Sequence, residues 1–317
     1  MLRGRSGMQG SCRSLRIRCH AQAATTLQRT TSNRAVPINP PYGIVITGST
    51  KGVGRALAEE FLRQGDTVII SSRSDERVTA AVSELSKEFG TERVKGLSCN
   101  VSQASEVRNL ADYARDQLGK VDIWINNAGT NAYKYGPLME STDEDLMEIV
   151  QTNVLGIMLC CKEAVRVMRE QSTGGHIFNM DGAGADGGAT PRFAAYGATK
   201  RCLSQLAKSL QAELGQAQVK NVGIHNLSPG MVTTELLMSG ADSPVSKFFI
   251  NCLADTPEEV ASFLVPRVRR IPQDNINPLT GTVNPSYVQY LTKQKAFSQI
   301  ITRVLTGKRK DKFVKEG

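Results

Sequence analysis

Short apolar runs alternate with longer amphipathic segments along most of the chain. The runs have the length and composition of buried strands, at residues 44–46, 67–71, 94–99, 121–126, 177–180 and 222–227. The amphipathic segments have helical periodicity, at residues 52–64, 75–88, 103–118, 146–168 and 194–214. This alternation predicts a parallel sheet covered by helices on both faces. Since such crossovers are right-handed, we expect a doubly wound, Rossmann-like α/β fold in a single domain.

One polar residue interrupts the apolar face of the helix expected at 146–168. That face carries, at helical spacing, Leu146, Ile149, Val150, Val154, Ile157, Met158, Cys161, Val165 and Met168. Asn153 lies in its middle, and a buried amide must find hydrogen-bonding partners. Two interpretations stay open, because Asn153 either has a structural role or holds a water that relays protons.

The net charge of +9 is concentrated at the two ends of the chain. Residues 1–40 contain seven arginines and no acidic residue, and residues 293–317 contain eight basic residues against two acidic ones. We therefore expect no nucleic-acid-binding face. An arginine-rich, acid-free N-terminus is typical of an organelle transit peptide, although a plain disordered arm has a similar composition. The proline-bounded segment 37–41 predicts that the ordered chain begins just after it.

The seven cysteines are scattered, and none forms a CxxC pair. Cys160 and Cys161 are adjacent within a helical pattern, so buried thiols in a reducing compartment are the expected state. The three histidines lie far apart in the sequence, and we expect no metal site. No run approaches the roughly 18 consecutive apolar residues of a membrane-spanning helix.

A glycine-rich turn follows the first expected strand and opens the first expected helix. It comprises Thr47, Gly48, Ser49, Thr50, Lys51, Gly52, Val53 and Gly54. Glycines here let the backbone approach a phosphate closely, and the helix N-terminus offers unpaired N–H groups to a pyrophosphate. A glycine cluster alone also fits a plain tight turn, but its place between a strand and a helix predicts a dinucleotide site.

The end of the second expected strand indicates which dinucleotide binds. It reads Ser71-Ser72-Arg73, without the acidic residue that usually binds the ribose 2′-hydroxyl of NAD. Arg73 suits a 2′-phosphate instead, and Lys51 supplies a second cation from the glycine turn. Either residue alone is compatible with ordinary surface charge, but together they favour NADPH over NADH.

Tyr196 and Lys200 are four residues apart, so they share one face of the helix expected at 194–214. The same face carries Leu203, Ala207 and Leu210, among which a lysine is unusual unless it extends outward to solvent. A nearby ammonium favours the ionised form of a tyrosine and lowers its pKa. Such a tyrosine can protonate a carbonyl oxygen while hydride reaches the carbon.

Together with two further segments, these motifs resemble the short-chain dehydrogenase/reductase family in order and spacing over about residues 42–290. The further segments are Asn126-Asn127-Ala128-Gly129 and Pro229-Gly230-Met231-Val232-Thr233. The resemblance implies that the first packs the central strand near the cofactor, and that the second contacts the nicotinamide carboxamide. It also implies an NADP-dependent carbonyl reductase.

The resemblance assigns roles to individual residues. Tyr196 is the expected proton donor, Lys200 also binds the nicotinamide ribose, and Asn153 completes the proton relay. The expected cofactor-binding residues are Thr47, Gly48, Ser49, Thr50, Lys51, Gly52, Val53, Gly54, Ser72, Arg73, Asn100, Val101, Asn127, Ala128, Gly129, Tyr196, Lys200, Pro229, Gly230, Val232 and Thr233.

The chain departs from the family pattern in two places. Asn100 stands where the family usually has an aspartate beside the adenine, which is a mild change. The family's catalytic serine is expected near Asp181 or Gly182, yet no serine occurs from residue 173 to 195. Backbone N–H groups of Gly182 or Gly184 are one substitute for it. Asp181 is another only when protonated, since a carboxylate repels a developing alkoxide.

Residues 176–187 and 190–201 resemble the chlorophyll(ide) b reductases of the non-yellow-coloring-like type, which typically have a serine near the position of Ala185. This resemblance implies NADPH-dependent reduction of the C7 formyl group of chlorophyll b or chlorophyllide b to hydroxymethyl, a step of chlorophyll catabolism. It further implies a chloroplast protein at the stromal face of the thylakoid membrane, with a related reductase as partner.

Two other functions stay open on the sequence alone. One is a different plastid carbonyl reductase, such as a 3-oxoacyl-carrier-protein reductase, although such enzymes usually end soon after the region of Gly281. The other is a non-catalytic partner subunit that keeps the fold and binds the cofactor, which the missing serine favours.

The last part of the chain is expected to follow the catalytic domain as a separate tail. The domain then covers residues 41–290, with a substrate loop near 236–256 whose apolar part is 247–253, and the tail covers 291–317. The tail has an amphipathic pattern, with apolar residues Leu291, Phe297, Ile300, Ile301, Val304 and Leu305 and basic residues Lys293, Lys295, Arg303, Lys308, Arg309, Lys310, Lys312 and Lys315. This pattern is typical of a helix at a membrane interface, and equally of a helix that packs on the sheet or on a partner.

Overall fold

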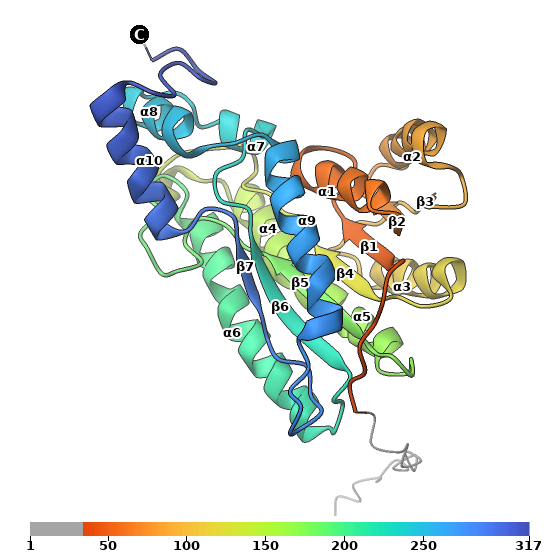
Figure 1. Cartoon of the computed structure of the whole chain (residues 1–317). Coiled ribbons are helices and arrows are strands. Elements are labelled where there is room, and N and C mark those ends of the chain that lie inside the picture. The colour runs from red at the N-terminus through yellow and green to blue at the C-terminus, as the bar shows by residue number, and fades with distance from the viewer. Residues whose placement is uncertain (1–33, 317) are drawn as a thin grey trace, which may run out of the picture. The chain divides into compact units, whose positions relative to one another are not determined.

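A seven-stranded parallel sheet runs through the centre of the chain (Figure 1), for which a computed structural model describes residues 34–316. Its strands have the spatial order β3-β2-β1-β4-β5-β6-β7. Their bounds are β1 (Gly43–Thr47), β2 (Thr67–Ser71), β3 (Val94–Gly96), β4 (Ile123–Asn126), β5 (Gly175–Met180), β6 (Val222–Ser228) and β7 (Tyr287–Gln289). The strand order reverses between β1 and β4, which is where doubly wound folds bind their ligands.

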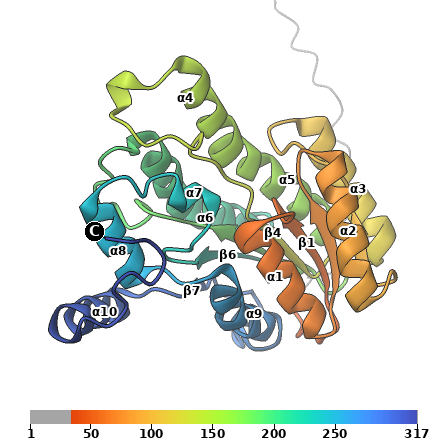
Figure 2. The ribbon, with the colours of Figure 1, turned by 90° about the horizontal axis from the view of Figure 1, so that it is seen from above.

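Helices cover both faces of this sheet (Figure 2). One layer contains α1 (Gly52–Arg63), α2 (Asp75–Phe89) and α9 (Pro257–Asp274). The other contains α3 (Ala104–Leu118), α4 (Asp143–Val150), α5 (Ile157–Met168) and α6 (Ala194–Gln216). The remaining helices are α7 (Glu235–Met238), α8 (Pro244–Leu253) and α10 (Lys293–Thr306). The predicted fold class is confirmed, and the described residues 34–316 form one compact unit.

The central strands are apolar along their whole length because both of their faces are buried. Ile44 and Ile46 contact the layer of α1 and α9, while Val45 between them contacts the layer of α3 and α5. All three side chains are fully buried. Each such residue stabilises the fold by about 1.5–3 kcal/mol relative to an exposed position. The sheet is therefore a rigid platform for the loops at its carboxyl edge.

The helix predicted at 146–168 is interrupted by a π-helical turn at Gln151–Gly156. This turn rotates the faces of α4 and α5 relative to each other, because it inserts residues out of the helical period. As a result Val150 and Met158, which the sequence pattern places on the buried stripe, are 49% and 43% exposed. Ile157 and Cys161 lie on the buried side as predicted.

Three elements near the C-terminus were not predicted from the pattern. Helices α8 and α9 both begin with a capping box, at Ser243 and Thr256, and each has proline at its first position. These start signals are present in the sequence and identify both helices. Strand β7 has only three residues and no such signal.

The ordered chain begins earlier than residue 41. The N–H of Ala35 donates to Gly281 O, and the buried Ile38 donates from its N–H to Pro272 O at 3.0 Å. The boundary predicted at residues 40–41 is therefore wrong, because the segment from about residue 35 packs against α9 and the loop before β7. Most of the expected transit peptide, residues 1–33, lies outside the described residues.

Two buried histidines of the sheet are paired with each other. His176 and His225 lie side by side on β5 and β6, with Nδ1 and Nε2 3.0 Å apart, and burial lowers the pKa of both imidazoles. Cys99, Cys160, Cys161 and Cys252 are buried free thiols, as expected.

Within residues 34–316, no helix combines the length and the apolar character that crossing a bilayer requires.

Candidate active site

A cavity of about 780 Å³ opens at the carboxyl edge of the sheet, beside the reversal of strand order. It is lined by most of the predicted cofactor-binding residues, namely Gly48, Thr50, Lys51, Gly52, Val53, Gly54, Ser72, Arg73, Asn100, Val101, Asn127, Ala128, Gly129, Tyr196, Lys200, Pro229, Gly230, Val232 and Thr233. Segments that follow five strands thus meet the starts of two helices in one place. A cavity of this size and position suits a dinucleotide together with part of a substrate.

The glycine turn lies directly against the end of β4. The amide of Asn127 donates from Nδ2 to Thr47 O at 3.0 Å and to Gly48 O at 2.9 Å. A side chain on Gly54 would collide with Gly48 O and with this amide. Gly48 has a φ of +64°, which favours glycine. The turn therefore presents bare backbone to the cavity, as a phosphate site requires.

Two predicted cofactor residues lie behind the cavity wall. The hydroxyl of Thr47 accepts from the N–H groups of Asn127 and Ala128. The fully buried Ser49 donates from Oγ to Ile46 O at 2.7 Å and accepts from Ser71 N–H. These two residues do not line the cavity, and a direct contact with the cofactor stays a prediction for them. Their hydroxyls fix the turn, because they satisfy its buried backbone groups.

The cations expected to bind a 2′-phosphate both line the cavity. Each is paired with a carboxylate at the rim, Lys51 with Glu235 and Arg73 with Glu148 at 3.3 Å. Arg73 is 69% exposed, so this pair is easily exchanged for a ligand anion. Arg77 also lines the cavity and was missed by the sequence reasoning. It lies one turn beyond Arg73, at the start of α2, a spacing that is visible in the sequence.

The α6 side of the cavity carries Tyr196 and the buried Lys200. Lys200 donates from Nζ to Met180 O at 3.0 Å, and Nζ lies 5.5 Å from the centre of the Tyr196 ring. Burial lowers the pKa of Lys200 to about 8. Burial also raises the pKa of Tyr196. The predicted lowering of the Tyr196 pKa by Lys200 is therefore not borne out, because burial disfavours the ionised phenol.

Asn153 lies in the π-helical turn, fully buried and behind the cavity wall. Its Oδ1 accepts from Thr130 N–H at 2.8 Å, and its Nδ2 donates to Thr130 O at 2.8 Å and to Thr199 Oγ1 at 3.1 Å. The amide thus ties the loop after β4 to α6, which is the structural interpretation. A proton relay through Asn153 stays a prediction.

Gly182, one of the two positions at which the family's serine was expected, faces the Tyr196 hydroxyl. A Cβ atom built on Gly182 would lie 2.5 Å from Tyr196 Oη. Ala185 is buried outside the cavity, and its carbonyl accepts from Arg201 at 2.9 Å. A serine at position 185 would therefore lie outside this cavity. Asp181, Gly182 and Ala183 line the cavity here.

Asp181 is an almost fully buried carboxyl group at the end of β5. Its Oδ2 accepts from the hydroxyl of Tyr287 on β7 at 2.5 Å. Its Oδ1 is buried and has no hydrogen-bond partner among the described residues. Burial raises the pKa of Asp181 above its ordinary value. A protonated Asp181 would hold a hydroxyl at Oδ1, next to the Tyr196 and Lys200 pair that lines the same cavity.

Aromatic and apolar side chains form the outer wall of the cavity. Tyr135, Phe193 and Tyr196 line it and also line an adjoining cavity of about 330 Å³. Leu236 and Leu237 on α7 also line the cavity. The segment 247–253, expected to contact the substrate, does not line either cavity, because its C-terminal half is buried against the tail.

Comparisons with known proteins found a matching family model and related sequences. A family model described as short chain dehydrogenase matches residues 43–243. Chlorophyll(ide) b reductase NOL, chloroplastic, of Oryza sativa subsp. japonica is 56% identical over 283 residues, which cover 89% of this chain and 81% of the relative. Its Arabidopsis thaliana counterpart is 57% identical over 285 residues, or 90% and 80%.

More distant matches cover only part of the relative's length, or share the fold at low sequence identity. Probable chlorophyll(ide) b reductase NYC1, chloroplastic, of Oryza sativa subsp. japonica is 46% identical, and the match covers 72% of this chain but 47% of the relative. A crystal structure of 3-ketoacyl-(acyl-carrier-protein) reductase from Brucella melitensis complexed with NADH has a TM-score of 0.66 at 22% identity, covering 80% of this chain and 98% of that one. At that identity the likeness concerns the fold.

Proposed function

Because this chain belongs to the short-chain dehydrogenase family, we propose that it uses NADPH to reduce the C7 formyl group of chlorophyll b or chlorophyllide b to hydroxymethyl. The protein is an oxidoreductase that depends on a nicotinamide cofactor. The observation that carries the proposal is the Tyr196 and Lys200 pair at the wall of a cavity whose opposite end is the bare glycine turn. The identity of 56–57% to curated chlorophyll(ide) b reductases, over most of both chains, supports the substrate.

Each part of the cavity has its own role in the proposed reaction. The glycine turn and the start of α1 fit a pyrophosphate, and Pro229–Thr233 borders the end where a nicotinamide would lie. When bound, a nicotinamide cofactor would supply a hydride to the formyl carbon. Tyr196 donates its hydroxyl proton to the formyl oxygen, so that the carbonyl becomes an alcohol. Lys200 stabilises the tyrosinate that remains, since an adjacent ammonium favours the ionised phenol.

Removing the Tyr196 hydroxyl tests the proton donor. We expect Tyr196→Phe to lower kcat for chlorophyllide b reduction by about 10²–10⁴-fold, because general acid catalysis contributes a factor of that order. The dissociation constant of NADPH should change less than about threefold, since the ring and its packing remain. Turnover and NADPH fluorescence titration measure the two effects. Wild-type turnover by the Phe variant would contradict the mechanism.

We assign the role of the absent serine to Asp181 in its neutral form. The Oδ2 of Asp181 accepts from Tyr287 and its Oδ1 has no partner among the described residues, so a neutral acid would carry its proton on Oδ1 and could donate it to a developing alkoxide once substrate binding gives access to this buried atom. The group acts only while protonated, so its contribution is present below its raised pKa and is lost as the pH rises through that value. A carboxylate at the same place would oppose the reaction.

Two substitutions test whether the side chain at position 181 acts as a hydrogen-bond donor or as a carboxylate. Asp181→Asn keeps a hydrogen-bond donor at this position, so we expect it to retain activity. Because Asn does not ionise, the variant should not show the loss of activity at high pH that ionisation of Asp181 causes. Asp181→Leu removes the donor and should lower kcat by about 10²–10³-fold, as for other oxyanion donors. Asp186→Asn, at a half-exposed aspartate outside the cavity, is the matched control. Equal loss of activity in the Asn and Leu variants would show that the ionised form is needed.

The cofactor preference rests on the cluster of Arg73, Arg77 and Lys51 at the adenosine end of the cavity. A 2′-phosphate can replace the rim carboxylates as their partner, while a 2′-hydroxyl cannot. We expect Arg73→Ala to lower the ratio of kcat/KM for NADPH over NADH by about tenfold, because a hydrogen bond to a charged group contributes about 1.5–3 kcal/mol. Lys87→Ala, at the far end of α2, should leave the ratio unchanged. If the wild-type protein had equal kcat/KM for NADPH and NADH, the assignment of these cations to the 2′-phosphate would be wrong.

The location that fits this substrate is the chloroplast, at the stromal face of the thylakoid membrane. The outward face of α10 supports a peripheral contact with the bilayer, since Phe297, Ile301, Val304 and Leu305 are 41–77% exposed on it. The exposed Lys293 lies at the start of the same helix. Lys293 pairs with Asp186 at 3.2 Å, and Arg303 is buried and pairs with Glu316, so the contact would depend mainly on this apolar face lying in the membrane interface. A related reductase as partner stays a prediction.

Negative charge introduced on the outward face of α10 should weaken this membrane contact. We expect Val304→Glu/Leu305→Glu to reduce sedimentation with anionic liposomes at least about fivefold, because two carboxylates oppose both the apolar burial and the lipid charge. Met139→Glu, at a residue 90% exposed on a different loop, is the control. Equal binding by the double variant and the control would exclude α10 as the contact surface.

A further inference from the structure

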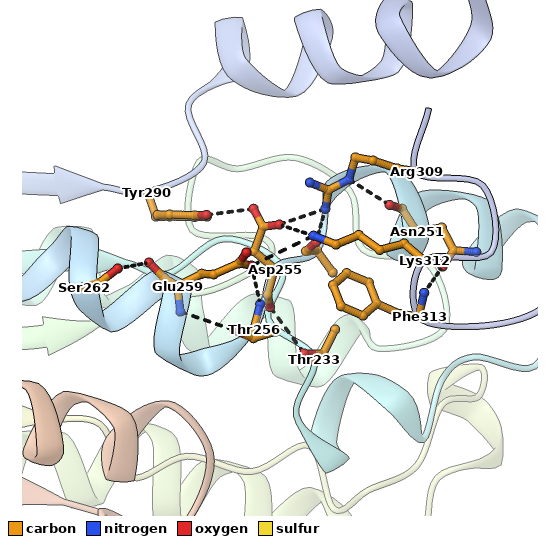
Figure 3. Close-up of polar contacts among 11 residues, drawn as sticks. Thr233, Asn251, Asp255, Thr256, Glu259, Ser262, Tyr290, Arg309, Lys312 and Phe313 are labelled. Atoms are coloured by element: carbon orange, nitrogen blue, oxygen red, sulfur yellow. Dashed lines mark hydrogen bonds and ion pairs between the residues drawn. The ribbon is translucent and has the colours of Figure 1, made fainter. Parts of the chain in front are cut away.

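A buried carboxylate, Asp255, joins the C-terminal tail to the loop between α8 and α9 (Figure 3). Its Oδ1 accepts from Arg309 at 2.9 Å and from Lys312 at 3.1 Å, and its Oδ2 accepts from the Tyr290 hydroxyl at 2.7 Å. Lys312 also lies 3.9 Å from Glu259. Two of the basic residues expected in a solvated or membrane-bound tail are therefore engaged inside the molecule.

The backbone of Asp255 holds one wall of the active-site cavity. Its N–H donates to Met231 O at 3.1 Å, and its carbonyl accepts from Thr233 N–H at 3.0 Å. These two bonds form a parallel bridge that pairs Asp255 with Val232. Met231, Val232 and Thr233 all line the cavity. The position of this wall therefore depends on where Asp255 lies.

The tail fixes this loop at several points in addition to the carboxylate. We call residues 307–316 the C-terminal strap. Asn251, fully buried at the end of α8, accepts at Oδ1 from the N–H groups of Phe313 and Val314, at 2.7 and 3.0 Å. Arg309 donates to Asn251 O at 3.0 Å and to Ala254 O. The strap thus satisfies polar groups of the segment that precedes Asp255, in addition to the Asp255 carboxylate itself.

We propose that the C-terminal strap is a positioning element of the cofactor site, in which Arg309 and Lys312 hold Asp255 and thereby hold Met231–Thr233 against the nicotinamide end of the cofactor. The proposal rests on the proposed use of NADPH. Without the two cations, Asp255 would keep only Tyr290 as a side-chain donor. A buried charge without adequate partners is unfavourable, so the loop would move toward solvent and carry the cavity wall with it.

Charge-matched double variants of the full-length protein test this role. We expect Arg309→Met/Lys312→Met to raise the dissociation constant of NADPH about tenfold, within the range of couplings carried through a contact network. The control, Lys310→Met/Lys315→Met, removes the same charge from two strap residues with exposed side chains and should stay within about twofold of wild type. The measurement is fluorescence titration with NADPH and no pigment. A wild-type protein that binds NADPH without reducing chlorophyllide b therefore leaves the proposal standing while the proposed function fails.

A rescue separates positioning from a general loss of stability. Adding Asp255→Asn to Arg309→Met/Lys312→Met removes the uncompensated charge, and we expect the dissociation constant to return to within about threefold of wild type. Unchanged NADPH binding in the double variant overturns the proposal. So does an equal loss in the control, because the cause would then be net charge, and so does a triple variant that binds no better than the double.

Discussion

The contact between the glycine turn and the end of β4 is the constraint on which the rest of the site depends. The Asn127 amide donates to two carbonyls of the turn, and the Thr47 hydroxyl accepts from the backbone N–H groups of Asn127 and Ala128. Only glycine fits at position 54, between them. Because β1 and β4 are neighbours in the sheet, this one junction aligns the helix that would hold the pyrophosphate with the strand end that leads toward α6.

The catalytic end combines charges that burial disfavours. Lys200 and Asp181 are both more than nine-tenths buried, and burial shifts each pKa toward the neutral form, down for the lysine and up for the aspartate. Neither group is held as an ion by a strong partner, since Lys200 donates to a carbonyl and Asp181 accepts from a phenol. Lys200, whose pKa is about 8, can change protonation state near neutral pH, and burial favours the neutral acid at Asp181, which suits a site that must deliver a proton as hydride arrives.

Most of the fold and of the cofactor site could be predicted from the sequence, because both depend on local patterns. Buried strands, helical periodicity and a glycine turn each occupy a few consecutive residues. Failures arise where the answer depends on distant parts of the chain. The π-helical turn that exposes Val150 and Met158 leaves no mark in the spacing. The pairing of Asp255 with Arg309 and Lys312 joins positions more than fifty residues apart. The pKa of Tyr196 follows from burial that only the folded chain defines.

The central claim is that this cavity brings a nicotinamide hydride, the Tyr196 proton and a pigment formyl group together. The direct test is incubation of the protein with chlorophyllide b and NADPH deuterated at C4 of the nicotinamide, followed by mass spectrometry of the pigment. The account predicts a 7-hydroxymethyl product that carries one deuterium on the new CH₂OH carbon. Oxidation of NADPH without deuterium in the pigment, or turnover of a 3-oxoacyl substrate with chlorophyllide b untouched, would contradict it.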